Sequence, residues 1–227
     1  MAALDANEMV VVVTGGDPID RAHLPTLPPG TLVIAADSGI DHAHALGLRV
    51  DIGIGDFDSV SADGLARAMA DGAVLERHPA EKDATDLELA LDVARARRPE
   101  RILLLGGHGG RLDHLLANAL LLAAPAYAGI ELSAQMGPAR VTVIHTAGLL
   151  TGAPGDIVTL LAAHGPATGI STTGLRYPLA DEDLQPGSSR GVSNELTEDH
   201  ATVSVTGGVV LAVQPGSINA RHEESTA

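Results

Sequence analysis

Short apolar runs alternate with helical patterns through the first 135 residues of the chain. Four of these runs are followed directly by Gly, Asp or Ser, and they span residues 10–14, 32–36, 51–54 and 101–105. This alternation predicts parallel strands joined by crossover helices. Because ligands bind at the carboxyl ends of strands in open α/β sheets, we expect the chemistry along that edge.

Three helices are predicted between and after these strands, over residues 61–70, 85–98 and 114–123. The second is the clearest, because Thr85 and Glu88 form a capping-box pattern at its start. Four apolar residues then fall on one helix face: Leu87, Ala90, Leu91 and Ala94. The third segment is apolar enough that we expect it to be buried.

After about Gln135 the pattern changes to short β-rich runs separated by Gly and Pro, over residues 141–145, 157–161, 201–205 and 209–213. The polar stretch 179–190 is predicted to be a mobile surface loop. The expected fold is therefore an α/β N-terminal domain with a mostly parallel sheet and flanking helices (1–135), followed by a small all-β sandwich domain (136–215). A disordered tail is expected over 216–227.

Composition narrows the classes of function. The formal net charge of -15 disfavours nucleic acid and anionic membranes as partners, and an anionic substrate would have to arrive with its cation. The absence of cysteine excludes disulfides, thiolate metal sites and cysteine nucleophiles. The N-terminal residues lack a basic, cleavable leader, so we expect a cytoplasmic protein.

Aromatic residues make up only 1% of the chain, whereas hydrophobic residues make up 45%. The core must therefore be built from aliphatic side chains, and a ring-shaped ligand would find few stacking partners.

Two carboxylates, Asp56 and Asp58, lie two residues apart on a turn that follows the strand ending at Ile54. Two bare carboxylates about 4 Å apart repel by roughly 4 kcal/mol at an effective dielectric of 20, so a cation between them is favoured. Mg²⁺ suits such hard oxygen ligands and leaves positions for phosphate oxygens. The alternative is an Asp-rich turn that caps the next helix through Ser59 or Ser61.

The segment from Lys82 to Asp86 places further charges at the start of the Thr85 helix, where amide groups favour an anion. Lys82 is the only lysine of the chain, which favours a compact charge that grips phosphate. Asp83 and Asp86 are either additional site carboxylates or ordinary charges at a helix N-terminus.

A glycine-rich loop, Gly106 to His114, follows a clean strand and opens the apolar helix. Its glycines, among them Gly109 and Gly110, allow close approach of phosphate, and Arg111 can neutralise it. The loop is neither a Walker A loop nor a dinucleotide fingerprint.

Taken in order, these segments resemble the thiamine pyrophosphokinase family. The N-terminal motifs that carry the resemblance are ADSG at Ala36, GDFDS at Gly55, KDATD at Lys82 and GGHGGRLDH at Gly106. In the second half it is carried by GISTTGLRYPL at Gly169 and GVSNE at Gly191. The resemblance covers roughly residues 10–213.

The resemblance implies an ATP-dependent thiamine diphosphokinase, active as a homodimer with its sites between subunits, in which the thiamine hydroxyl attacks the β-phosphorus of Mg-ATP and AMP leaves. It implies three groups of site residues. Magnesium would be held by Asp56, Asp58 and Asp83 or Asp86, which are also the catalytic candidates. ATP would be contacted by Asp37, Lys82, Gly109, Gly110, Arg111, Asp113 and His114. Thiamine would be contacted by Ser193 and Asn194.

Two departures from the family pattern leave alternatives open. Some members stack a tryptophan on thiamine, and this chain has none, so apolar side chains near residues 209–211 would have to cover the ring. The base is also unassigned, with Asp37 and Asp58 as candidates. Alternative functions are a pyrophosphokinase for another hydroxymethyl heterocycle of the pterin type, or a non-catalytic nucleotide sensor.

Overall fold

The structure is a computed structural model that describes residues 8–79 and 81–216. These residues divide into two compact units, and each is considered by itself. Unit 1 contains residues up to 121 together with 130–137, and unit 2 contains 122–129 and the residues from 138 onward. Residues 217–227 of the expected disordered tail lie outside the described residues.

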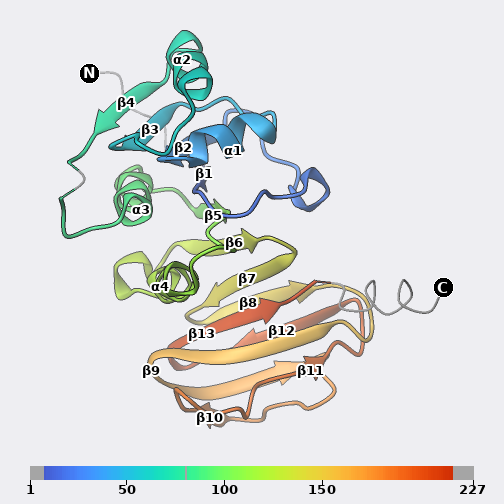
Figure 1. Cartoon of the computed structure of the whole chain (residues 1–227). Helices are drawn as coiled ribbons and strands as arrows, with labels where there is room; N and C mark the ends of the chain where they lie inside the picture. Colours follow the sequence, from blue (N-terminus) through green and yellow to red (C-terminus); the bar gives the residue numbers. More distant parts are fainter. Residues whose placement is uncertain (1–7, 80, 217–227) are drawn as a thin grey trace. The chain divides into compact units, whose positions relative to one another are not determined.

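Unit 1 is built on six strands that pair side by side in parallel, in the order β4-β3-β2-β1-β5-β6 (Figure 1). Their bounds are β1 Met9–Val13, β2 Leu32–Ala36, β3 Ile52–Gly55, β4 Val74–Arg77, β5 Arg101–Leu105 and β6 Glu131–Met136. Consecutive residues of β1, β2, β3 and β5 are buried, as expected for strands covered on both faces.

Helices flank this sheet (Figure 1), and they are α1 Gly39–Ala45, α2 Ala62–Ala70, α3 Asp86–Ala96 and α4 Leu112–Leu122. Side chains of α1 and α2 share one apolar cluster with β1, β2 and β5, whereas α3 contacts β1, β2 and β3 outside that cluster. The Ser61 and Thr85 side chains cap α2 and α3 by accepting from Gly64 N–H and Glu88 N–H. Two short 3-10 helices are η1 Arg21–His23 in unit 1 and η2 Pro125–Tyr127 in unit 2.

The expected burial of the α4 segment is wrong. Of the residues in α4 only Leu122 is buried, and Leu112, Leu116 and Leu120 are 68%, 55% and 50% exposed. The spacing of four residues aligns these leucines on one side of the helix. An apolar sequence predicts that a helix is buried, but it does not indicate whether the residues that bury it belong to the same chain.

Unit 2 is rich in antiparallel β-structure, which confirms the predicted order of an α/β part followed by a β part. Its strands are β7 Ala139–Ile144, β8 Ala147–Thr151, β9 Ile157–Thr173, β10 Glu182–Leu184, β11 Asn194–Glu195, β12 His200–Ser204 and β13 Gly207–Gln214. The long strand β9 organises the unit, because β10, β11, β12 and β13 all pair with it.

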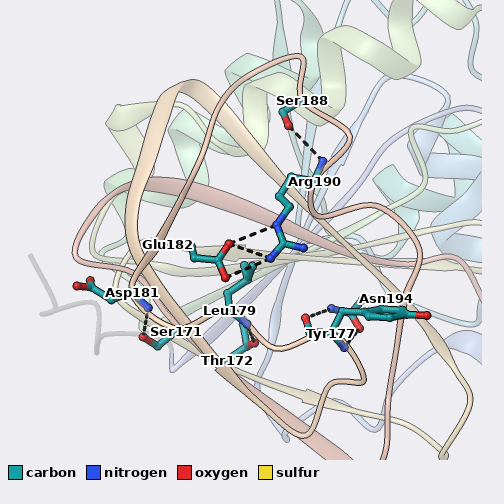
Figure 2. Close-up of polar contacts among 9 residues, drawn as sticks. All are labelled: Ser171, Thr172, Tyr177, Leu179, Asp181, Glu182, Ser188, Arg190 and Asn194. Carbon is teal, nitrogen blue, oxygen red and sulfur yellow. Dashed lines mark hydrogen bonds and ion pairs between the residues drawn. The ribbon is translucent and has the colours of Figure 1, made fainter.

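The segment 179–190 is not the free surface loop that its polarity predicts. It contains β10, and the side chains of Leu179 and Leu184 are buried in the unit 2 core. Arg190 closes the segment on itself through hydrogen bonds to both carboxylate oxygens of Glu182, at 2.8 and 3.1 Å (Figure 2). Two leucines in an otherwise polar stretch are enough to anchor it.

Within residues 8–79 and 81–216, no helix has the length and apolarity needed to cross a membrane.

The start of α1 depends on a close backbone approach at Gly39. A Cβ atom there would lie 2.2 Å from the Val13 carbonyl oxygen at the end of β1, and backbone cannot yield cheaply. We therefore expect Gly39→Ala to lower the free energy of unfolding by about 2 kcal/mol or more. Gly207→Ala is the control, because its Cβ would meet only the Thr168 hydroxyl, at 2.8 Å, and should cost less than about 1 kcal/mol. Equal urea midpoints for the two variants would contradict this packing.

Candidate functional site

A cleft of about 590 Å³ lies in unit 1 at the carboxyl ends of the parallel strands. Its volume is in the range of small-molecule sites. The loops after β1, β2, β3 and β5 contribute to it, together with the segment before α3 and the first turns of α4. The lining residues include Thr14–Gly16, Ala36–Ser38, Asp56, Ser59, Lys82–Leu87, Gly107–Arg111, His114, Ala117 and Asn118.

Three carboxylates meet at this edge. Asp37, Asp56 and Asp58 each offer an oxygen, and the three oxygens lie within 4.8 Å of one another. The Oδ1 atom of Asp37 is buried and has no hydrogen-bond partner. A buried, unpaired carboxylate oxygen beside two further carboxylates fits a hard divalent cation such as Mg²⁺.

The sheet register brings Asp37 to this group. Ala36 pairs with Ile54, and the Asp37 N–H donates to the Ile54 carbonyl at 2.8 Å. A Cβ on Gly55 would lie 3.3 Å from Asp37 Cβ and equally far from Asp86 Oδ1, so this glycine lets the carboxylates of two other segments approach β3.

Two residues of the cluster's loops have left-handed backbone, Asp37 with φ 46° and Phe57 with φ 63°. Non-glycine residues in this region cost free energy and collect at functional sites. The loop carrying Phe57 is held from β4, because Arg77 donates to the Asp56 carbonyl at 3.0 Å and its guanidinium lies 5.0 Å from the Phe57 ring centre. The strain is therefore supported by fixed neighbours.

Burial raises the pKa of the Asp37 carboxyl, and the charges of Asp86 and Asp56 act in the same direction. Hydrogen bonds from Ser38 and Ser59 oppose the rise without cancelling it. The charged form of Asp37 is thus disfavoured, first by burial and then by neighbouring carboxylates, as expected for a group arranged to receive a cation.

Lys82 and Asp86 form an ion pair across one turn, with 2.5 Å between Nζ and Oδ1, and their side chains are only 16% and 25% exposed. Asp86 is the first residue of α3, and Asp83 lines the cleft as an exposed residue. The structure therefore places Asp83 and Asp86 in the cleft, but it groups Asp37 rather than either of them with Asp56 and Asp58.

The glycine-rich loop after β5 is joined to the loop after β1. Gly107 N–H donates to the Gly15 carbonyl at 2.9 Å, and Asp17 N–H donates to the His108 carbonyl at 2.8 Å. The Asp17 carboxylate lies against Gly109, where a Cβ would come within 2.1 Å of it. The two loops therefore form one backbone wall of the cleft.

The remaining expected nucleotide residues lie at the cleft mouth. Gly110 has φ 60° and open space around its Cα, and Arg111, Asp113 and His114 are exposed. Arg111 binds both oxygens of Asp113, at 3.1 and 2.5 Å, and this pair lowers the pKa of Asp113 to about 2. The guanidinium is thereby oriented before any ligand arrives.

Sequence reasoning missed the loop after β1 and one residue of α4. Thr14, Gly15 and Gly16 line the cleft, and Asn118 donates to the Gly107 carbonyl at 3.2 Å. The glycine pair Gly15 and Gly16 directly after β1 was the available signal for this loop, because the other three loops also begin with Gly, Asp or Ser directly after a strand. Asn118 has no local signal.

Ser193 and Asn194 belong to unit 2 and are not among the residues that line this cleft. Ser193 is exposed with φ 57°, and its N–H donates to Thr159 Oγ1 at 3.1 Å. Asn194 is 6% exposed, and its amide makes hydrogen bonds to the backbone of Tyr177 and Glu195. Contact of either residue with a substrate stays a prediction.

The apolar residues expected from sequence to cover a substrate ring are buried. Val209, Val210 and Leu211 are 6%, 0% and 4% exposed, so their side chains are not accessible.

Comparison with known proteins gives one family across both units. The family model "Thiamin pyrophosphokinase, catalytic domain" matches residues 27–134, and "Thiamin pyrophosphokinase, vitamin B1 binding domain" matches residues 142–210. The thiamine pyrophosphokinase of Bacillus subtilis (strain 168) is 29% identical over 195 residues, which cover 81% of this chain and 87% of that protein.

Solved structures agree with this result. The crystal structure of the Bacillus subtilis thiamine pyrophosphokinase superposes with a TM-score of 0.80 at 25% identity, covering 92% of this chain and all of that one. The thiamin pyrophosphokinase of Geobacillus thermodenitrificans gives 0.78 at 27% identity, covering 93% and 99%.

Burial of the Asp37 carboxylate beside other carboxylates predicts that Asp37→Asn makes the protein more stable to unfolding. In metal-free protein the variant should be more stable to unfolding, by at most about 1 kcal/mol, because a buried charge is removed from beside other carboxylates. Asp63→Asn, at an exposed position of α2, is the matched control and should not gain.

Added Mg²⁺ should reverse the order, because it stabilises the wild type more than the variant. The measurement is urea denaturation with EDTA and with Mg²⁺. A variant that is less stable than wild type in EDTA would show that the Asp37 charge is not under strain.

Proposed function

The chain belongs to the thiamin pyrophosphokinase family, and we propose that its unit 1 cleft transfers the diphosphate of Mg-ATP to the hydroxyl of thiamine, giving thiamine diphosphate and AMP. The observation that carries the proposal is the group of three carboxylates at the strand ends, two of which, Asp37 and Asp56, line the same cleft as the glycine-rich loops. Neither the pterin alternative nor the sensor alternative has support from the comparisons.

Magnesium would be held by Asp56 and Asp58, as the sequence predicts, with Asp37 as the third ligand supported by geometry. Asp86 is a further candidate, because its Oδ1 and the Asp37 Cβ both lie 3.3 Å from the position of a Cβ on Gly55, and Asp83 at the cleft wall is another. When bound, the metal neutralises phosphate oxygens and lowers the cost of charge that develops during transfer.

ATP would be oriented by the backbone and the cations of the cleft. Gly109 and Gly110 let the chain approach the phosphates, and Arg111 presents a guanidinium already oriented by Asp113. Lys82 is paired with Asp86, and a phosphate oxygen can replace that carboxylate as its partner. His114 completes the mouth of the cleft.

In the reaction the thiamine hydroxyl oxygen forms a bond to the β-phosphorus of ATP. The bond between that phosphorus and the oxygen bridging to the α-phosphate breaks, and AMP leaves with the bridging oxygen. The hydroxyl proton passes to a carboxylate of the cleft or to water, with Asp37 and Asp58 as the candidate acceptors. No covalent intermediate is needed, so the residues act by positioning and charge neutralisation.

We propose that the enzyme is a homodimer with its active sites between subunits, as the family resemblance implies. The exposed leucines of α4 support an apolar contact, because large apolar side chains at 68%, 55% and 50% exposure are unusual on a helix that has no partner.

We also propose that the enzyme works in the cytoplasm without nucleic acid or membrane partners, which the net charge of -15 supports.

The function is tested by incubating the protein with ATP, Mg²⁺ and either thiamine or a hydroxymethylpterin, and by following products with mass spectrometry. We expect equimolar AMP and thiamine diphosphate. Asp58→Asn should lower turnover by roughly 100-fold or more with an unchanged unfolding transition, whereas Asp63→Asn should retain it. If AMP forms only with the pterin, the substrate is a pterin alcohol and not thiamine. If no AMP forms with either alcohol, the proposed transferase activity is refuted.

The dimer is tested by introducing charge on α4. Leu116→Glu should convert the dimer to monomer in light scattering at micromolar concentration, because burying an unpaired carboxylate at an apolar contact is costly. Leu149→Glu is the control, since Leu149 is 62% exposed on β8 and is not on that helix. A monomeric wild type would contradict the proposal. A dimeric Leu116→Glu variant would show that the dimer interface does not involve this face of α4.

A further inference from the structure

Asp41 of α1 binds Ser61 at the start of α2, the helix that contacts α1 (Figure 1). Asp41 Oδ2 accepts from the Ser61 N–H at 2.7 Å, and Asp41 Oδ1 accepts from the Ser61 hydroxyl at 2.6 Å. The Ser61 hydroxyl oxygen accepts in turn from the Gly64 N–H at 3.0 Å and so caps α2. Both oxygens of the Asp41 carboxylate are therefore used on one residue, which closes the loop that carries Asp56 and Asp58.

The contact depends on the missing side chain of Gly64. A Cβ atom there would lie 1.9 Å from Asp41 Oδ1 and 2.9 Å from Asp41 Cγ. Gly64 is buried inside α2, where glycine is a poorer helix former than alanine. Its place in the helix is therefore explained by the room that the Asp41 carboxylate needs, and not by helix stability.

The loop between β3 and α2 is held at two points. Near its start, Arg77 of β4 donates to the Asp56 carbonyl at 3.0 Å, and at its end Asp41 holds Ser61. Between these points Phe57 has φ 63°. A strained backbone persists only where its surroundings fix it, so both supports are needed to keep the carboxylates of this loop in place.

The start of α1 also fixes Asp37, the third carboxylate of the cluster. The Asp37 carbonyl accepts from the Ile40 N–H at 3.0 Å, and the Asp41 N–H donates to the Ser38 carbonyl at 3.1 Å. These turns set Asp41 relative to Asp37. One helix start therefore places Asp37 directly and the other two carboxylates through Ser61.

We propose that Asp41 is a positioning residue, which acts through Ser61 to hold Asp56 and Asp58 at the distance from Asp37 that a divalent cation requires. Asp41 is not among the residues that line the cleft. The role of the cation rests on the proposed function. Because the bonds between Asp41 and Ser61 are exposed, they should contribute little to the free energy of unfolding, and their loss should appear in metal affinity instead.

Mn²⁺ binding to the full-length protein, followed by the electron paramagnetic resonance of free Mn²⁺, measures this arrangement without catalysis. The binding that Asp58→Asn removes defines the site of the cluster. We expect Asp41→Ala to weaken that binding roughly tenfold. Asp41→Asn should remain within about threefold of wild type, because its amide can accept from the Ser61 N–H and donate to the Ser61 hydroxyl.

Asp63→Ala is the control for charge, because Asp63 is an exposed carboxylate of α2. It should change Mn²⁺ affinity by less than about twofold, since exposed charges are screened. Wild-type affinity in Asp41→Ala would overturn the inference. Equal losses in Asp41→Asn and Asp41→Ala would also overturn it, because the charge of Asp41 and not its bonds would then matter.

Gly64→Ala tests the same contact without changing Asp41. The added methyl group meets the far end of the Asp41 side chain, which can rotate away and release Ser61. Helix propensity alone predicts that this variant is folded and has a urea midpoint at least as high as wild type. We nevertheless expect it to bind Mn²⁺ roughly tenfold more weakly.

The double variant of Asp41→Ala and Gly64→Ala should bind Mn²⁺ within about twofold of either single variant, because both changes remove one contact. Additive losses would show that the two residues act separately and would contradict the inference.

Release of AMP distinguishes this inference from the proposed function. The Mg²⁺ concentration for half-maximal AMP release should rise in Asp41→Ala, with KM for thiamine unchanged. A wild type whose Mn²⁺ binding depends on Asp41 but which releases no AMP would support the inference and refute only the transferase. Thiamine diphosphate formation with unchanged Mn²⁺ affinity in Asp41→Ala would overturn the role of Asp41 alone. If Asp58→Asn removes no Mn²⁺ binding, both this inference and the assigned metal site are wrong.

Discussion

Burial of the Asp37 carboxylate beside those of Asp56 and Asp58, at the ends of β2 and β3, is the constraint on which the site of unit 1 depends. Asp37, Asp56 and Asp58 are held with oxygens within 4.8 Å, and one oxygen of Asp37 is buried without a partner. Such a group is unfavourable until a cation joins it. Left-handed backbone at Asp37 and Phe57 maintains it, and the parallel sheet supplies the rigidity that holds this strain.

The two units carry cavities of different composition. The cleft of unit 1 gathers acidic groups, glycine backbone and a few cations, which together suit a nucleotide accompanied by its metal. A small pocket of unit 2 is lined by polar and apolar side chains, and its Arg190 is paired with Glu182.

Features set by local sequence were predictable, and features set by tertiary packing were not. The strands β2 and β5 and the caps Ser61 and Thr85 follow from runs and spacing, and the pair Asp56 and Asp58 is adjacent in sequence. Asp37 joins them only through the parallel register of β2 with β3. Exposure of α4 and the anchoring of 179–190 depend on neighbours that no local pattern shows.

Anomalous scattering from Mn²⁺ in crystals grown with a non-hydrolysable ATP analogue would test the carboxylate site most directly. An anomalous peak coordinated by oxygens of Asp37, Asp56 and Asp58, and by phosphate oxygens of the analogue, is the expected result. A nucleotide bound in the cleft with its metal held by other residues, and with no metal at these three carboxylates, would contradict the assignment of this cluster as the metal site.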